Sequence, residues 1–248
     1  MKLAPLCLLP LVALIAACSQ PADPVDAEPS ATETPLAAAT PSGPFAPRND
    51  CGNLPGAQAF LDKITAATAA RDVDALIALA DVHVRLGFGG EDGAANLREA
   101  LEEADGGLWG EIDTLSAMGC AVTQTGEFTT ITMPWYFAQD MDGDPFETMI
   151  VTSENVPVHE AASDNSAQLA TVSWDAVQLV PEEGAGGVIN FGGPDDNGWR
   201  HVRLPAAEGA EPIVGYMRAS TLRSVVDYRL LAHNGDGQWK ISALLAGD

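Results

Sequence analysis

The spacing of apolar residues predicts that the chain from residue 56 onward folds first as helices and then as strands. Side chains at three- and four-residue spacing predict a helix over 56–72. The residues along one side of this helix are Phe60, Ile64, Ala67 and Arg71. Asp72 and Asp74 can cap a second, shorter helix that runs to Asp81.

The stretch 82–88 alternates as a half-buried strand does. Its apolar positions, expected on one face, are Val82, Val84, Leu86 and Phe88. Asp92 begins a further helix, and another helical stripe follows the glycines at 106–107. The apolar residues of these two helices are Leu97, Leu101, Leu108, Ile112 and Leu115.

Antiparallel strands are expected to follow the helices, at 121–124 and 128–133, with Thr125-Gly126 as their turn. Two more strands, 227–231 and 238–245, flank the Gly-containing segment 233–237, a pattern typical of a hairpin. Helices followed by antiparallel strands predict the α+β class.

The middle of the chain, from Met149 to about Leu222, has short apolar runs, frequent turns and no helical period. The predicted strands are 150–152, 155–159, 168–172, 176–180, 199–203 and 214–217. They predict a small β-barrel.

Two arrangements of these parts are open. In the first, a barrel at 148–224 is inserted into an α+β domain made of 51–147 with 225–248. In the second, the domains follow in series and the final hairpin belongs to the barrel. Insertion is favoured because 51–147 alone has few strands for a stable sheet. A contact between 82–88 and 238–245 distinguishes the two.

The first 17 residues have the pattern of a removed signal peptide. A basic Lys2 precedes an apolar stretch that Pro10 interrupts and that ends in small residues. An apolar run of about 15 residues is too short to span a bilayer of about 30 Å.

The run Leu14-Ile15-Ala16-Ala17-Cys18 resembles the lipobox of bacterial lipoproteins. The resemblance implies cleavage before Cys18, lipidation of Cys18 and anchoring in a membrane. Ser19 in the next position implies the outer membrane of a Gram-negative cell, facing the periplasm. An ordinary secretory signal cut after Ala17 is the alternative.

Residues 18–50 read as a disordered linker behind the lipidated cysteine. The segment is rich in Pro, Ala, Thr, Ser and acidic residues and has no apolar period. It cannot bury enough surface to offset the entropy of ordering. We therefore expect it to hold the folded part away from the membrane.

Cysteine use agrees with an oxidising compartment. Cys7 leaves with the signal, and Cys18 carries the lipid, so Cys51 and Cys120 remain as an even pair. We predict a disulfide between them. The alternative is a catalytic thiol at Cys120, which would need a partner His.

Charge excludes one class of partner. The chain has 12 Lys and Arg against 35 Asp and Glu, a formal net charge of −23. Nucleic-acid binding depends on neutralising phosphates with cationic side chains, so we expect none. An anionic membrane surface would not attract this chain either.

Two short motifs suggest an architecture for the α+β part. Ala70-Arg71-Asp72 after the first helix and Trp239-Lys240-Ile241 in the last strand resemble the cystatin-like fold of the nuclear-transport-factor-2 superfamily. The resemblance implies an opening helix packed across a curved antiparallel sheet. The order of elements between the motifs departs from that pattern.

The middle segment resembles bacterial SH3-like domains over about 75 residues. The matching positions are Asn155-Val156, Leu169 to Thr171, Trp199 to Val202 and Gly215-Tyr216. The resemblance implies a barrel that recognises an extended peptide through an aromatic-lined groove. The chain departs from the family in a long insertion, 181–197, and in Pro157, where Arg is common.

Candidate chemistry beyond the lipid is sparse. The acidic run 140–144 suggests a calcium site. It does not match an EF-hand loop, because Pro145 and Val151 occupy the positions where that loop needs Gly and Glu. The four histidines show no metal-ligand spacing, and no nucleophile elbow, phosphate loop or dinucleotide fingerprint is present. We therefore expect no catalytic residues, no metal and no cofactor.

The remaining candidates are aromatic side chains, for which core packing and ligand binding are the two alternatives. They are Trp135, Tyr136, Trp174, Trp199 and Tyr216. The function expected is an envelope-anchored binding or structural lipoprotein that recognises peptidoglycan peptide or a protein partner through the barrel. The alternative is a cystatin-like pocket for a small molecule, and a cell-wall hydrolase is a minor one.

Overall fold

The computed structural model describes residues 41–90, 92–103, 106–125, 128–183, 189–190, 198–206 and 209–247. The expected signal peptide, Cys18 and most of the linker lie outside the described residues, as does Gly126. The described part contains two large sheets and four α-helices, so the α+β class is confirmed.

The first sheet has the order β1-β3-β4-β14-β15-β2. Its strands are β1 (Arg48–Asn49), β3 (Gly119–Thr125), β4 (Phe128–Met133), β14 (Arg229–Gly235), β15 (Gln238–Leu245) and β2 (Ala80–Arg85). The two outer strands pair in parallel with their neighbours, and the four central strands are antiparallel. β2 pairs with β15 at Ala80 and Arg85, so the last strand belongs to the same sheet as the first helical segment.

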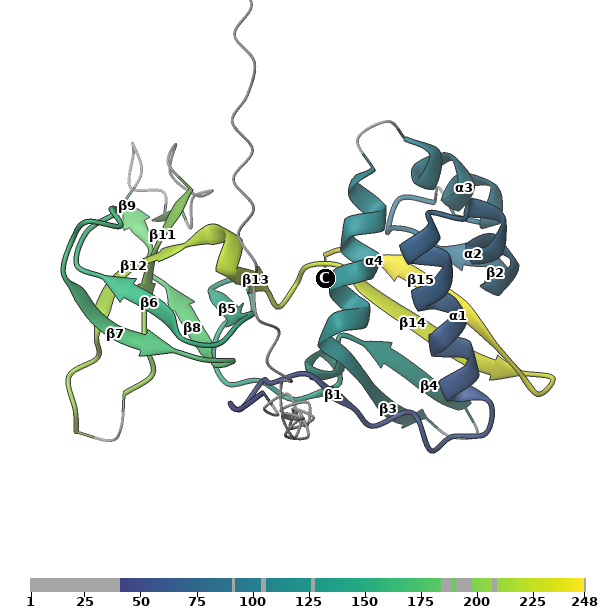
Figure 1. Ribbon diagram of the computed structural model, residues 1–248, viewed down its shortest axis with the longest axis horizontal. Helices are drawn as coiled ribbons and strands as arrows, with labels where there is room; N and C mark the ends of the chain where they lie inside the picture. Colours follow the sequence, from purple (N-terminus) through teal and green to yellow (C-terminus); the bar gives the residue numbers. More distant parts are fainter. Residues whose placement is uncertain are drawn as a thin grey trace, which may run out of the picture. The chain divides into compact units, whose positions relative to one another are not determined.

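Four helices accompany this sheet (Figure 1). They are α1 (Ala57–Ala70), α2 (Val73–Leu79), α3 (Ala94–Glu102) and α4 (Gly107–Met118). The apolar stripe of α1 is buried at Phe60, Ile64 and Ala67. The helix ends where Arg71 takes a left-handed conformation, and the Asp72 carboxylate then accepts the Ala75 N–H at 3.0 Å to cap α2.

The strand expected at 82–88 forms as β2, Ala80–Arg85, so Phe88 lies outside it, and the burial predicted for the apolar positions is only partly correct. Val84 is fully buried, whereas Val82 and Phe88 are 68% and 59% exposed. β2 is an edge strand whose register against β15 shifts within the pair. Such a shift disrupts strict alternation, so the period of two does not hold along the strand.

The final hairpin is tighter than the sequence suggests. β14 and β15 pair as far as Gly235 and Gln238, which leaves a two-residue turn, Asp236-Gly237. Both turn residues have positive φ, 52° and 76°. That geometry matches the twist of the flanking strands, which is why a short Asp-Gly turn replaces the five-residue loop expected at 233–237.

The second sheet has seven strands in the order β13-β5-β8-β11-β12-β6-β7. In that order they are Leu222–Ser224, Thr148–Val151, Ala176–Leu179, Trp199–Arg203, Val214–Arg218, Val156–His159 and Gln168–Val172. The described pairings form an open order with β13 and β7 at its edges, so they do not show a closed barrel. Within the expected insertion, β9 (Glu182–Glu183) pairs with β10 (Ile189–Asn190), and the residues around β10 lie outside the described part.

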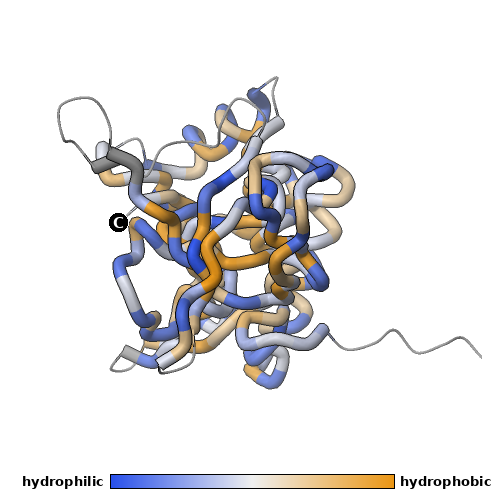
Figure 2. Tube along the Cα trace, turned by 90° about the vertical axis from the view of Figure 1, so that its left-hand side faces the viewer, coloured by the Kyte–Doolittle hydropathy of each residue, from blue (hydrophilic) through white to orange (hydrophobic). Residues whose placement is uncertain are grey.

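Each sheet has its own apolar core. The helices cover the first, and the inner face of the second is lined by aliphatic side chains that include Val158, Val202 and Met217. In Figure 2 hydrophobic segments, drawn in orange, gather toward the centre of the molecule. The helices of the described part are all too short or too polar to cross a membrane.

Candidate functional site

Cys51 and Cys120 form a disulfide, and both are essentially fully buried. The bond connects the loop before α1 to β3, beside the pairing of Asn49 with Cys120. A cysteine in a disulfide has no free thiol, so Cys120 in this oxidised state cannot act as a nucleophile.

Trp135 and Tyr136 lie in the short 3₁₀ helix η1 (Trp135–Ala138) and are 3% and 1% exposed. They pack in a third apolar cluster with Phe45, with Ala121 of β3 and with Ile150 of β5, so they join residues of both sheets. The Trp135 Nε1 donates to the Ala46 carbonyl at 3.0 Å. Core packing, one of the two alternatives for these rings, is what the structure shows.

A polar group accompanies this cluster, and we call it the joint: Glu111, Tyr136, Arg223 and Asp227. Arg223 of β13 is 7% exposed, and its guanidinium lies 2.9 Å from the Glu111 carboxylate of α4 and 3.5 Å from that of Asp227. Among the described residues, the Tyr136 Oη and the Arg223 Nε have no hydrogen-bond partner. Burial raises the pKa of Tyr136 to about 12, opposed by the nearby Arg223 charge.

The two tryptophans of the second sheet differ in surroundings. Trp199 is 3% exposed although it lies on the face opposite the apolar core, because the Arg218 guanidinium covers its ring at 4.1 Å and His159 packs edge-on at 5.4 Å. Trp174 is half-buried against the third cluster, with a left-handed φ of 46°. Trp199 therefore offers no ring face to a ligand in this conformation.

The outer face of β11 and β12 brings aromatic and basic side chains together. Cross-strand pairing places Trp199 opposite Arg218, His201 opposite Tyr216 and Arg203 opposite Val214. Tyr216 also pairs with His159 of β6. We call this set the β11–β12 face: His159, Trp199, His201, Arg203, Tyr216 and Arg218.

The centre of the β11–β12 face is a pair of stacked rings. His201 and Tyr216 are both half-buried, with ring centroids 4.6 Å apart and planes 12° from parallel. At one end, Arg218 forms an ion pair with Asp164, whose pKa is held below its ordinary value by that hydrogen bond. At the other end, Arg203 is exposed and has no ion pair within the described part of the chain.

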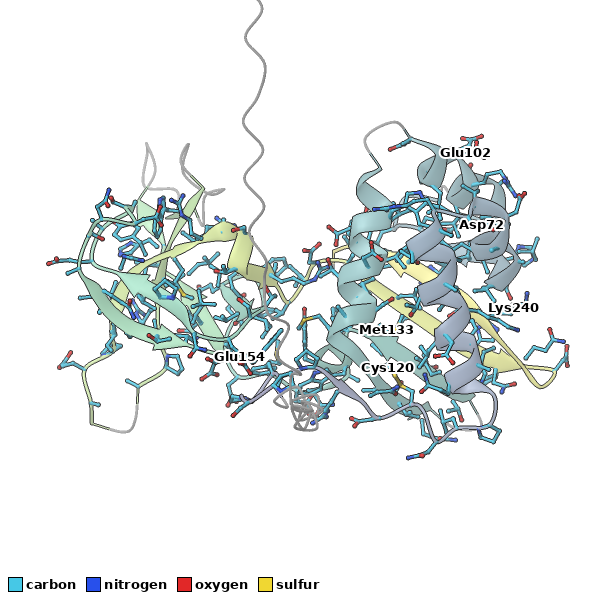
Figure 3. All side chains as sticks on the ribbon, in the orientation of Figure 1. Asp72, Glu102, Cys120, Met133, Glu154 and Lys240 are labelled. Carbon is cyan, nitrogen blue, oxygen red and sulfur yellow. A yellow bond between two sulfur atoms is a disulfide. The ribbon has the colours of Figure 1, made fainter. Side chains whose placement is uncertain are left out.

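Two cavities complete the candidates. One of about 140 Å³ lies between α1, α4 and the first sheet, and the Ser116 Oγ in its lining has no hydrogen-bond partner among the described residues. Figure 3 labels two of its lining residues, Cys120 and Met133.

A second cavity, of about 400 Å³, is lined by the acidic side chains Asp140, Asp142 and Asp175. In the described residues no three His, Cys, Asp or Glu side chains gather as a metal site requires.

Sequence reasoning passed over four members of the β11–β12 face. His159 and His201 show no metal-ligand spacing in the sequence, and Arg203 and Arg218 were given no role. A signal was present, because residues two apart in a strand share a face, and so 199, 201 and 203 lie together, as do 214, 216 and 218. The missing information was the pairing of β11 with β12 and of β12 with β6.

Comparisons with known proteins leave the family open. No family model and no curated protein matches the chain. Among solved structures, the chain is similar to an NTF2-like protein with a cystatin-like fold from Novosphingobium aromaticivorans. The two share 10% identity at a TM-score of 0.26, with 75% of each chain covered. A likeness this weak carries no argument about fold or function, so the architecture rests on the strand pairings above.

Proposed function

We propose that this protein is an outer-membrane lipoprotein, anchored through Cys18, whose second sheet is an SH3-like binding module for an extended peptide of the cell wall. The His201–Tyr216 stack carries the proposal. It lies on the sheet face away from the apolar core, where half-buried rings can receive a ligand. No catalytic step is proposed.

Several features of the second sheet support a peptide rather than a compact ligand. The β11–β12 face follows paired strands, and the third strand, β6, continues it through His159. Stacked aromatic rings beside cationic groups suit an extended chain that lies across them. Peptidoglycan peptide is the favoured source because the lipobox resemblance implies a location in the envelope; an envelope protein is the other source.

Cosedimentation with purified sacculi tests the proposal. Tyr216→Ala should weaken binding at least about tenfold, because loss of a central aromatic anchor typically costs 2 kcal/mol or more. Phe128→Ala is the matched control, since Phe128 is a 73% exposed ring on β4 of the first sheet. Equal binding by the Tyr216 variant and the wild type would contradict the proposal.

The anchor is tested separately. Labelled palmitate should enter the full-length protein in cells and should not enter a Cys18→Ser variant. Incorporation that survives this substitution would remove Cys18 as the lipidated residue.

A second candidate function is a small-molecule pocket in a cystatin-like first sheet. The observation that favours it is the unpartnered Ser116 Oγ in the cavity of about 140 Å³. This volume is below the usual range for ligand pockets, so it suits only a small polar molecule. A metabolite that raises the melting temperature of the wild type and not of Ser116→Ala would support it; no stabilising metabolite would count against it.

A further inference from the structure

The charge on the strands of the proposed module is opposite to that of the whole chain. The chain carries a formal net charge of −23. Strands β6, β11 and β12 nevertheless contain three arginines, two histidines and no aspartate or glutamate. Four of these residues lie on the β11–β12 face, namely His159, His201, Arg203 and Arg218, whereas Arg200 is on the other side of β11 with Val202. A local basic strip in so acidic a protein selects for an anionic group.

Arg203 is the member of this strip that is available to a ligand. Its cross-strand neighbours, Val214 and Gln178, carry no charge. Its side chain is exposed and forms no ion pair with any described residue, whereas Arg218 is paired with Asp164 and Arg223 with Glu111. An exposed guanidinium presents a fork of donors that matches a carboxylate.

Arg203 lies close to the stacked rings of His201 and Tyr216. Arg203 and His201 are two residues apart on one strand and face the same way, so their side chains leave the sheet about 7 Å apart. A peptide that lies over the His201–Tyr216 rings can therefore place a carboxylate against Arg203. The acidic cavity lined by Asp140 and Gln178 lies on the β8 side of Arg203, so an anion is favoured on the β12 side, toward the rings.

We infer that the peptide recognised by the β11–β12 face is acidic, with one of its carboxylates bound by Arg203 beside the His201–Tyr216 stack. This inference rests on the proposed function and specifies its ligand. The charge of −23 does not oppose it strongly, because salt at physiological strength screens exposed charges beyond about 8 Å.

The test compares native sacculi with sacculi whose carboxyl groups have been converted to amides. Wild-type protein should bind the amidated sacculi about tenfold more weakly, the loss expected for one charge-assisted hydrogen-bonded pair. Arg203→Gln should bind native sacculi about tenfold more weakly and should show little further loss on amidated sacculi. Arg203→Lys should recover part of the affinity, because it restores the charge without the fork.

Arg85→Gln is the control variant, since Arg85 is an exposed arginine of β2 in the first sheet, and it should bind both preparations as the wild type does. Equal wild-type binding to native and amidated sacculi, with no effect of Arg203→Gln, would overturn the inference and leave the proposed function intact. Absence of wild-type binding to either preparation would instead overturn the proposed function.

Discussion

Replacing Arg223 with methionine should destabilise the fold by removing the cation of the joint. Arg223 is buried, and its guanidinium faces the Glu111 and Asp227 carboxylates and donates to the Tyr228 carbonyl at 3.3 Å. Methionine fills similar space with a flexible apolar chain, so the loss of charge is tested with little loss of packing. The Glu111 and Asp227 carboxylates then lose the cation that they share.

The magnitude follows from the burial of the partners. Removal of one partner from a buried ion pair typically costs 3–5 kcal/mol. Here the Glu111 and Asp227 side chains keep 32% and 34% of their exposure, so water offsets part of that cost. We therefore expect Arg223→Met to lower the free energy of unfolding by about 2–3 kcal/mol. For a chain of this size the melting temperature should fall by roughly 5–10 °C.

Urea denaturation of a double-mutant cycle with Glu111→Gln measures the coupling directly. We expect a coupling of about 1–2 kcal/mol between Arg223 and Glu111, since they are in contact and share a network. Arg98→Met is the control, because Arg98 pairs with Asp74 at the surface and such pairs contribute little. A stability of Arg223→Met equal to that of the wild type, or a coupling of zero, would refute the assigned role of the joint.

Three further predictions concern titration and the disulfide. The pKa of Tyr136 is raised to about 12, so its neutral form stabilises the fold below about pH 10, and this contribution is lost as the pH rises toward 12. Across that pH range the free energy of unfolding of the wild type should fall by on the order of 2–3 kcal/mol. The Tyr136→Phe variant should not show this fall. The depressed pKa of Asp164 gives a contribution that is full above the ordinary aspartate range and is lost as acid protonates the carboxylate; the melting temperatures of wild type and Asp164→Asn should therefore differ at neutral pH and converge in strong acid. Cys51 and Cys120 are 69 residues apart, so replacing both with alanine should cost about 4 kcal/mol of chain entropy in a urea titration, and a loss under 1 kcal/mol would contradict that account.

Local periodicity predicted most of the elements. Buried Phe60 and Ile64 lie four residues apart on α1, and the six short strands expected between Met149 and Leu222 all form. Both patterns depend only on neighbouring residues, which is why they are visible without a structure. The edge position of β2 is not local, so the exposure of Val82 could not be predicted.

The candidate site was less predictable because it depends on pairing between distant strands. Tyr216 was identified from its motif, yet its stacking partner His201 and its neighbour His159 became part of a site only through the order β11-β12-β6. The joint is still harder to predict from the sequence, because Arg223 and Glu111 are 112 residues apart. Trp199, which is part of the SH3-like resemblance, is covered by its neighbours and is the least accessible residue of the β11–β12 face.

The chain leaves and re-enters the first sheet at one place, and this explains why the joint lies where it does. Met149 pairs with Ser224, and the Val225 N–H reaches the Thr148 carbonyl at 3.3 Å, so the second sheet starts and ends side by side. β14 then takes a central place between β4 and β15, so the first sheet is complete only after the chain has returned. Two adjacent strand ends therefore connect the second sheet to the first, and the third apolar cluster packs residues of both sheets beside them. Buried Arg223 at that point supplies directional contacts to α4 that two backbone connections alone cannot provide.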